Sequence, residues 1–319
     1  MHSFNQAPEQ EVVNLNVRPF QAILHDGPRN HVIVLRLDDA VREVIEGMGI
    51  TIPNEDKSVI YKGSTRGGAA AEMKRLRRLN KIGIGPKLYG EQTKTTRIDT
   101  PNGRRTITSG NGMFLEHIPY HSLLYEGFER RRCVSDAKAA MVGALICDEA
   151  DRMHSEANLI HGDIKPDNVL VSPDLDAVRI IDFDSTAPTG NDGNSVYTFE
   201  YKAPERAGGK PMRPEADEYA AGVVIHTLLT RRYMHSQSSN LPFARFDRHE
   251  TVFPDQSTRR LPRTTSADLT DVIFKCLKKG PEHRYPRCSD AAKEFAEVAV
   301  ILDPAAVLHP VIAKLRRAV

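Results

Sequence analysis

The stretch LIHGDIKPDNVLV, Leu159–Val171, limits what this chain can fold into more than any other part of the sequence. It places Asp163, Lys165 and Asn168 between two apolar runs, although side chains of these types are costly to bury. Polar groups in such a setting need partners, either in the protein or in a ligand. This loop is therefore the first candidate for a functional site.

A short β-hairpin is predicted directly after the loop, from the runs NVLV and VRIID. The second run ends at Asp182, so the strand fixes where that carboxylate points. Asn168 and Asp182 then stand at the two ends of one hairpin as oxygen ligands, which suit Mg²⁺ and its phosphate partners. Asp163 can act as the base that orients a hydroxyl, and Lys165 can neutralise phosphate charge. The alternative is a polar loop in which Asp and Asn only form turns. This would account for a single Asp or Asn, but it does not account for the whole set of polar residues at this spacing.

Short β-like runs dominate the chain from residue 31 to residue 118. One helix is predicted among them at residues 69–83, where Met73, Leu76 and Leu79 have helical spacing. Asn–Gly pairs at 102–103 and 111–112 predict hairpin turns. The β-like runs are HVIVLRL, GITIP, SVIYKG, TRIDT, RTITS and GMFLEHI.

Helical patterns dominate after about residue 119. A long helix is predicted with Ser135 or Asp136 as its N-cap, and others follow around 215–231, 266–279, 288–301 and 304–317. Strands followed by helices are typical of an α+β protein with two lobes. We predict an extension at residues 1–30, a β-rich lobe at 31–118 and a helical lobe at 119–319. The last helix either packs on the large lobe or binds a partner.

Composition narrows the classes of function and location. The net charge of +2 and the pI near 8.3 are too mild to indicate nucleic acid. The longest apolar run, Ala139–Cys147, is far shorter than the about 18 residues of a membrane span, so no membrane partner is expected. The N-terminus lacks the basic start and apolar run of a secretory signal. Four scattered cysteines without a CxxC pair predict reduced thiols and a cytoplasmic protein, in a host cytosol if it is a secreted effector.

Several motifs follow one another in the order in which protein kinases carry them. HGDIKPDN resembles the catalytic loop, DFD the metal-binding motif, VIYK the strand of the ATP-binding lysine, and AAEMKRLRRL helix C. TFEYKAPE, DEYAAGVVI and CLKKGPEHRYP resemble the end of the activation segment, the start of helix F and the last motif. Over roughly residues 40–300 the chain resembles a divergent serine/threonine protein kinase. The resemblance implies a bilobal kinase fold, with a small β-rich lobe that carries helix C and a larger α-helical lobe.

The resemblance implies a nucleotide site in the β-rich lobe. Lys62, held by Glu72, would bind the α- and β-phosphates of ATP. Leu115 would stand at the gatekeeper position. Glu116 and Ile118 would offer backbone groups to adenine.

The resemblance also implies the catalytic roles. Asn168 and Asp182 would hold Mg²⁺, or Mn²⁺ in its place. Asp163 would accept the proton of the substrate hydroxyl, and Lys165 would bind the γ-phosphate. Lys165 and Thr198 stand where serine/threonine kinases keep a lysine and a threonine, so we expect protein substrates with Ser or Thr acceptors.

The chain departs from the family pattern at four points. The glycine-rich phosphate loop is degenerate, and its best candidate is IEGMGI, with Gly47 and Gly49. Gly162 replaces the arginine that binds a phosphorylated activation loop, which suggests activity without that switch. Asp184 replaces the glycine of the metal-binding motif, where it either limits flipping of that motif or brings one more carboxylate near the metal. Tyr197 replaces a second glycine, the one before Thr198. These departures fit a divergent bacterial or viral member better than a regulated eukaryotic signalling kinase.

Other positions carry structural expectations. Glu205 and Arg284 resemble the buried ion pair that anchors the activation segment, and Asp217 would hold the catalytic loop backbone. Self-phosphorylation is expected between Asp182 and Glu205, with Ser195 the first choice. The candidate hydroxyls are Ser185, Thr186, Thr189, Ser195, Tyr197 and Thr198.

Two other functions compete with a protein kinase. HGD followed by IIDFD also resembles aminoglycoside and choline kinases, but Lys165 and the motifs KAPE, DEYAAG and PEHR disfavour that alternative. The weak glycine loop is compatible with a pseudokinase scaffold that binds nucleotide, whereas the full set of Lys62, Asp163, Asn168 and Asp182 argues for an enzyme. Residues 231–265 are either a docking surface or a plain loop. The sequence indicates no oligomeric state.

Overall fold

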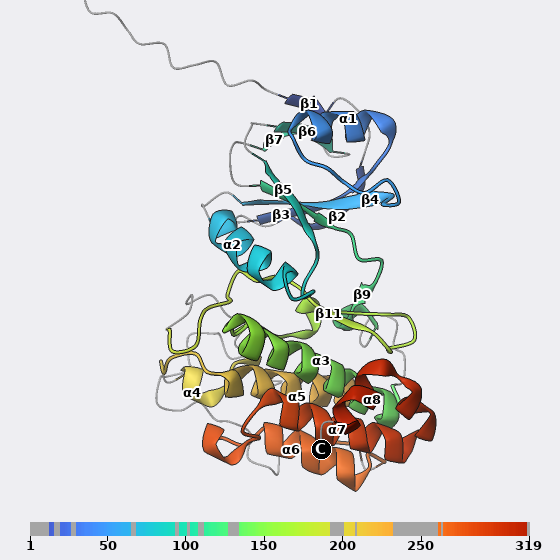
Figure 1. Ribbon diagram of the computed structural model, residues 1–319, viewed down its shortest axis with the longest axis vertical. Coiled ribbons are helices and arrows are strands. Elements are labelled where there is room, and N and C mark those ends of the chain that lie inside the picture. The colour runs from blue at the N-terminus through green and yellow to red at the C-terminus, as the bar shows by residue number, and fades with distance from the viewer. Residues whose placement is uncertain are drawn as a thin grey trace, which may run out of the picture. The chain divides into compact units, whose positions relative to one another are not determined.

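The computed structural model divides into two compact units (Figure 1). The N-terminal unit comprises Met1–Lys81 and Pro86–Pro119, and the C-terminal unit comprises Ile82–Gly85 and Tyr120–Val319. The structure describes residues 13–15, 20–26, 30–64, 68–92, 96–100, 103–107, 112–126, 134–191, 201–207, 209–231, 261–262 and 264–317. Ser195, Tyr197, Thr198 and most of the segment 231–265 lie outside these residues.

A five-stranded antiparallel sheet forms the centre of the N-terminal unit, in the order β2-β3-β4-β8-β5. Its strands are β2 (Phe20–Asp26), β3 (Asn30–Arg36), β4 (Ser58–Ser64), β5 (Leu88–Gln92) and β8 (Gly112–Glu116). The register places Lys62 of β4 opposite Val32 and Met113. β2 falls within residues 1–30, so part of the predicted extension is an edge strand of this sheet.

Helix α1 (Asp39–Gly47) joins β3 to β4 and covers part of the sheet. Asp38 caps it, because its carboxylate accepts a hydrogen bond from the Val41 amide at 2.9 Å. Val41 and Ile45 are fully buried in one cluster with Leu35, Tyr61 and Phe114. The sequence analysis missed this helix and expected a strand at GITIP, residues 49–53, which is irregular. The spacing of Val41, Val44, Ile45 and Met48 carried the missed helical signal.

A second sheet of the N-terminal unit has the order β1-β6-β7. Its strands are β1 (Val13–Leu15), β6 (Thr96–Thr100) and β7 (Gly103–Ile107). β6 and β7 pair antiparallel, which confirms the hairpin predicted at 102–103. The hairpin predicted at 111–112 was wrong, because β7 pairs with β6 whereas β8 pairs with β4 and β5. An Asn–Gly pair permits a tight turn but does not decide which strands it joins.

The C-terminal unit is built around helix α3 (Asp136–Ala157). Ser135 caps it and accepts a hydrogen bond from the Lys138 amide at 3.3 Å. Gly143 lets helix α7 (Cys288–Leu302) approach closely, since an added Cβ would lie 2.9 Å from the Phe295 ring. The other helices are α4 (Pro204–Ala207), α5 (Pro214–Thr230), α6 (Ala267–Cys276), α7 (Cys288–Leu302) and α8 (Pro310–Arg317). The helices predicted around 215–231, 266–279 and 288–301 form, with bounds shifted by up to three residues. The helix predicted at 304–317 is divided into the 3-10 helix η6 (Pro304–Leu308) and α8.

Helix α8 packs on its own unit. Ile312 and Leu315 are buried, and Lys314 lies 3.2 Å from Asp148 of α3. This favours the packing alternative for the last helix. None of the helices in the described ranges combines the length and the apolar character that crossing a membrane requires.

A small three-stranded sheet of the C-terminal unit carries the candidate site. Its order is β11-β10-β9, with β9 (His121–Ser122), β10 (Val169–Val171) and β11 (Val178–Ile180). β10 and β11 pair antiparallel, which confirms the hairpin predicted from NVLV and VRIID. The short 3-10 helix η2 (Pro166–Asn168) leads into β10.

Candidate active site

Asp217 of α5 fixes the backbone of the polar loop. It is buried, and its two carboxylate oxygens accept hydrogen bonds from the amides of His161 and Gly162, both at 2.8 Å. His154 of α3 lies 2.9 Å from the same carboxylate. Burial acts to raise the pKa of Asp217, but the His154 hydrogen bond and the loop amide outweigh it and lower the pKa. The predicted support of the loop by Asp217 is confirmed.

His154 is a site residue that sequence reasoning missed. It lies in the last turn of α3, 63 positions before its partner Asp217. No local motif connects two residues so far apart in the chain. A buried histidine beside a buried aspartate becomes recognisable once the helices pack.

Asp163 is held by two neighbours in its own loop. The Lys165 Nζ donates to the Asp163 Oδ2 at 2.8 Å. The Asn168 side-chain amide donates to the Asp163 carbonyl at 2.9 Å and to its Oδ2 at 3.3 Å. The carboxylate therefore has a fixed direction beside a positive charge. The side-chain nitrogen of Asn168 makes the hydrogen bonds to Asp163. The side-chain oxygen of Asn168 therefore points away from Asp163 and can act as a cation ligand.

The ends of the hairpin are tied together at the site. The Ile181 amide donates to the Asn168 carbonyl at 2.9 Å, so the residue before Asp182 is fixed to the loop. The buried His161 ring lies 3.1 Å from the Ile181 carbonyl and packs edge-on against Phe183, with ring centroids 5.4 Å apart. The structure thus brings together the loop and the carboxylate after the second strand.

Asp182 has a backbone conformation that is rare for a residue with a side chain. Its φ of +67° lies in the left-handed region, and such strain gathers at functional sites. Carboxylate oxygens of Asp182 and Asp184 lie within 4.8 Å of one another. With the Asn168 side-chain oxygen, the C-terminal unit offers possible metal ligands that are all oxygens, which fits a hard cation such as Mg²⁺.

The N-terminal unit brings Lys62 and Glu72 together. The Lys62 Nζ of β4 donates to the Glu72 Oε1 of helix α2 (Gly68–Asn80) at 2.7 Å. Both side chains are buried, with relative exposures of 7% and 2%. Breaking one side of such a pair leaves a buried charge without compensation, which is costly.

The end of β8 carries the residues expected to face adenine. The Glu116 amide donates to the Lys87 carbonyl at 2.8 Å, and the Glu116 side chain accepts from the Lys87 amide at 3.0 Å. The Glu116 amide is therefore engaged within the unit. Leu115 is buried and Ile118 is half-buried.

The expectation for Gly47 and Gly49 needs correction. Gly47 is the last residue of helix α1, and Gly49 follows in a turn with a φ of +79°. Both residues lie in the helical connection from β3 to β4, not in a short loop between two paired strands. The two glycines end a helix, for which a positive φ just past the last turn is common. The connection between β2 and β3 lies outside the described residues.

Gly162 lies close to the end of a neighbouring side chain, which would have to move to make room for a Cβ. Its φ is +78°, and an added Cβ would lie 2.2 Å from the Met212 Cε. Met212 is buried in a small cluster with Ile160 and Ala187. Ile160 and Ala187 exchange backbone hydrogen bonds of 2.8 and 3.0 Å. The chain after Asp182 is thus fixed to the loop by backbone pairing and apolar contact.

The predicted ion pair between Glu205 and Arg284 is confirmed. Two guanidinium nitrogens of Arg284 lie 2.8 Å from the two Glu205 oxygens. Arg284 is buried, donates to the Glu215 carbonyl at 2.8 Å, and lies over the Tyr219 ring. The pair ties α4 to the segment before α7.

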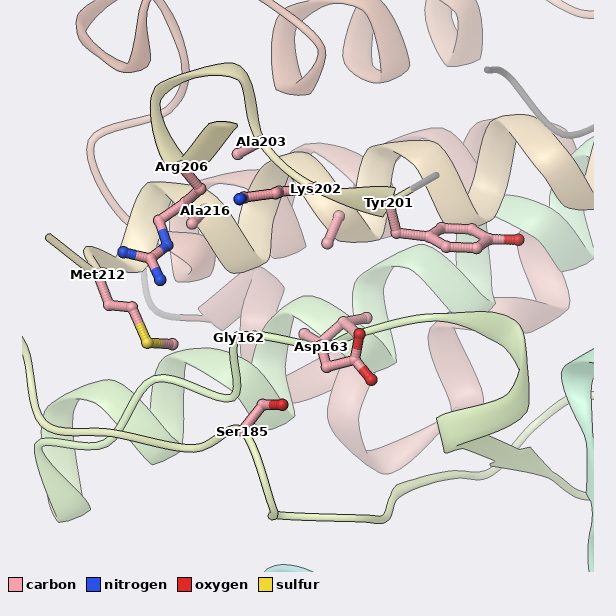
Figure 2. A pocket seen from close by; sticks show the side chains of 11 residues that line it. Gly162, Asp163, Ser185, Tyr201, Lys202, Ala203, Arg206, Met212 and Ala216 are labelled. Atoms are coloured by element: carbon pink, nitrogen blue, oxygen red, sulfur yellow. The ribbon is translucent and has the colours of Figure 1, made fainter. Parts of the chain in front are cut away.

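Figure 2 shows a hollow of the C-terminal unit that borders the Asp163 side chain. It is a shallow hollow, and the non-atom space of about 440 Å³ within its bounds includes open solvent. Lys202 and Arg206 reach into it from α4 and the residue stretch just before it. Its described lining is Gly162, Asp163, Ile164, Ser185, Tyr201, Lys202, Ala203, Arg206, Met212, Ala216 and Ala220.

Two of the hydroxyls considered for self-phosphorylation are buried. Ser185 is 7% exposed, and Thr186 is fully buried with its hydroxyl donating to the His161 carbonyl. Thr189 is exposed. Ser195, Tyr197 and Thr198 lie outside the described residues.

Comparisons with known proteins agree with the geometry. A family model described as protein kinase domain matches residues 107–295. A probable serine/threonine-protein kinase of Corynebacterium efficiens is 30% identical over 171 residues, which cover 50% of this chain and 25% of the relative. The serine/threonine-protein kinase PknB of Mycobacterium tuberculosis is 29% identical over 168 residues, which cover 50% of this chain and 26% of PknB. The chain thus spans about a quarter of the length of these curated relatives.

A solved structure shares the fold. The kinase PK-1 of the Cydia pomonella granulovirus matches with a TM-score of 0.61 and 15% identity, over 91% of this chain and 94% of that one.

Proposed function

The chain belongs to the protein kinase family, and on that premise we propose that it transfers the γ-phosphate of Mg-ATP to Ser or Thr hydroxyls of protein substrates. Serine/threonine-protein kinases among its relatives support this choice of acceptor. So does Lys165, two residues after Asp163, where the serine/threonine members carry a lysine.

The observation that carries the proposal is the fixed Asp163 carboxylate, held by Lys165 at 2.8 Å and by Asn168. The acceptor oxygen forms a bond to the γ-phosphorus while the bond from that phosphorus to the bridging oxygen breaks. The electron pair of the broken bond leaves with ADP, and the hydroxyl proton passes to Asp163. Lys165 stabilises the charge on the transferred group.

Membership of the kinase family supports an assignment of the nucleotide and metal ligands. Lys62, oriented by Glu72, would bind the α- and β-phosphates, and Leu115, Glu116 and Ile118 would line the adenine side. Bound Mg²⁺ would neutralise phosphate charge. Its ligands would be Asn168 and Asp182, with Asp184 nearby. Gly47 and Gly49 are not among the proposed nucleotide-binding residues, because they lie at the end of helix α1.

The test is transfer of labelled γ-phosphate from Mg-ATP to the protein itself and to a generic basic protein. Asp163→Asn is expected to lower the rate by about 10²–10⁴-fold, because it removes the proton acceptor. Asp167→Asn is the matched control, since Asp167 is an exposed carboxylate of the same loop. Lys62→Met should also abolish transfer, whereas Lys57→Met, at an exposed lysine before β4, should not.

The alternatives predict different outcomes. Mg-dependent ATP binding without label on any protein would contradict the proposal and point to a small-molecule acceptor of the aminoglycoside or choline type. A nucleotide-dependent thermal shift without phosphate transfer to any protein or small molecule would point to a nucleotide-binding scaffold. Label on the wild-type protein itself would extend the proposal to self-phosphorylation, for which Ser195 and the exposed Thr189 are the candidates.

A further inference from the structure

Two side chains meet where strand β4 begins and strand β8 ends. The Ser58 Oγ lies 2.6 Å from the His117 Nδ1, and both side chains are half-buried. The two residues are 59 positions apart in the chain, and both belong to the N-terminal unit. Their hydrogen bond therefore ties the residue that directly follows β8 to the strand that carries Lys62.

The pair lies on the face of the sheet that carries Lys62. Side chains two positions apart in a strand share a face, so Ser58 and Lys62 point to the same side of β4. The register places Ile60 opposite Leu115, and the next pair in this row is Ser58 and His117. The apolar cluster beside helix α1 uses the alternate residues of β4 and so lies on the other face. The hydrogen bond thus ends the row of side chains that begins at Lys62.

The segment before Ser58 is itself held in place. The Arg42 guanidinium of α1 donates to carbonyl oxygens in the connection from α1 to β4. They are those of Pro53 at 3.2 Å, Asn54 at 3.3 Å and Asp56. The Leu37 amide also donates to the Lys57 carbonyl at 2.9 Å. Ser58 therefore offers its hydroxyl from a backbone that several contacts fix.

The end of β8 has a second tie, on the side of β5. The Glu116 amide donates to the Lys87 carbonyl, and the Glu116 side chain accepts from the Lys87 amide. His117 follows directly and is tied to Ser58. Glu116 and Ile118, which are expected to offer backbone groups to adenine, therefore flank a residue that is fixed to β4.

The His117 ring suits this bond in its neutral form. Burial lowers the pKa of His117 below its ordinary value of 6.5, so the ring carries no charge near pH 7. A neutral imidazole has one donor and one acceptor nitrogen, and a hydroxyl can match either role. The pair therefore keeps its hydrogen bond without placing a charge at the end of β8.

We propose that Ser58 and His117 are positioning residues for the nucleotide, because their hydrogen bond holds the backbone of Glu116 and Ile118 in the geometry that binds the base. The inference deepens the proposed function and rests on it. The bond acts through the backbone and touches no reacting atom. Its loss should weaken nucleotide binding equally in the ground state and the transition state, which raises KM and leaves kcat unchanged.

The test combines steady-state kinetics at varied ATP with calorimetric binding of Mg-ADP. Ser58→Ala and His117→Leu each remove one partner of the hydrogen bond. Each should raise the KM for ATP and the Kd of Mg-ADP by about three- to tenfold, the size expected for one hydrogen bond, at an unchanged kcat. Thr51→Ala removes an exposed hydroxyl of the same unit and should change none of these values.

Further variants separate the hydrogen bond from the packing of the two side chains. Ser58→Thr keeps the hydroxyl, and His117→Asn places an amide group at the position of the ring Nδ1, so both should keep KM and Kd near the wild-type values. The double variant Ser58→Ala, His117→Leu should lose no more than either single variant, since all three lack the same bond. A loss of stability alone would not produce this pattern.

Three results would overturn the inference and leave the proposed function intact. The first is an active Ser58→Ala enzyme with wild-type KM and Kd. The second is an equal loss in His117→Asn and His117→Leu, and the third is a pair of losses that multiply in the double variant. Failure of the wild-type protein to transfer phosphate to itself or to any other protein would instead overturn the proposed function, and this inference with it.

Discussion

At the scale of single residues, Gly162 shows how one missing side chain shapes the site. Its φ of +78° disfavours any residue with a Cβ, and Met212 occupies the space where the Cβ would be. Its amide donates to Asp217, and the next residue is Asp163. A change at Gly162 therefore acts directly on the direction of the Asp163 carboxylate.

We expect Gly162→Ala to destabilise the protein by about 1–3 kcal/mol and to lower phosphate transfer. The matched control is Gly190→Ala, where φ is +86° but nothing lies within 4 Å of the added Cβ. Chemical denaturation and transfer assays measure both effects. Met212→Ala in the Gly162→Ala background should recover part of the lost stability, and equal losses at Gly162 and Gly190 would exclude the contact with Met212 as the cause.

At the scale of elements, helix α4 is a short helix that depends on one buried ion pair. The side chains of Arg284 and Glu205 are 0% and 7% exposed. The helix has four residues, too few for a stable helix in isolation. Its position, and with it that of Arg206, therefore depends on Arg284.

Removing one partner of this pair should cost more than removing both. We expect Arg284→Met or Glu205→Gln alone to destabilise the protein by about 3–5 kcal/mol, because each leaves a buried charge. The double variant Glu205→Leu, Arg284→Met should lose less than the sum. Arg316→Met, which breaks the partly exposed pair with Glu297, should cost about 0–1 kcal/mol. Urea midpoints measure all four, and additive losses would contradict the assignment of a coupled buried pair.

At the scale of the whole molecule, two buried carboxyls couple stability to pH. Burial raises the pKa of Glu149 to about 7 and that of Glu218 to about 8, against an ordinary value of 4.5. Arg179 opposes the shift at Glu149, and the Tyr285 amide and Arg284 oppose it at Glu218. Between pH 4.5 and these values, the folded protein keeps protons that the unfolded chain has lost.

Stability should therefore fall as pH rises. The two protonated carboxyls contribute fully to the free energy of unfolding below pH 4.5. This contribution is lost as pH rises through about 7 for Glu149 and about 8 for Glu218. Each group adds a slope of at most about 1.4 kcal/mol per pH unit within its window. Glu218→Gln should flatten the dependence of stability on pH between pH 5 and pH 8, because glutamine does not titrate. The variant should still fold, since its side-chain oxygen can accept the hydrogen bond from the Tyr285 amide. Glu282→Gln, at an exposed carboxylate, should leave the profile unchanged, and an unaltered profile in Glu218→Gln would refute the coupling.

Much of the fold follows from local signals in the sequence. The long helix after Ser135, the hairpin from Val169 to Ile180 and most of the later helices form where hydrophobic periodicity and capping residues place them. Helix α1 carried the same signals and was missed. The hairpin at 111–112 failed for a different reason, because a turn sequence does not determine its strand partners.

The sequence by itself determined the family and the local chemistry of the site, because Asp163, Lys165 and Asn168 lie within one loop and their contacts span a few residues. Tertiary structure decided the rest. Contacts between Asp217 and His154, Gly162 and Met212, and Glu205 and Arg284 join residues that are tens of positions apart. Local patterns specify which groups are present and which of them meet within one loop, whereas packing specifies which groups from distant parts of the chain meet.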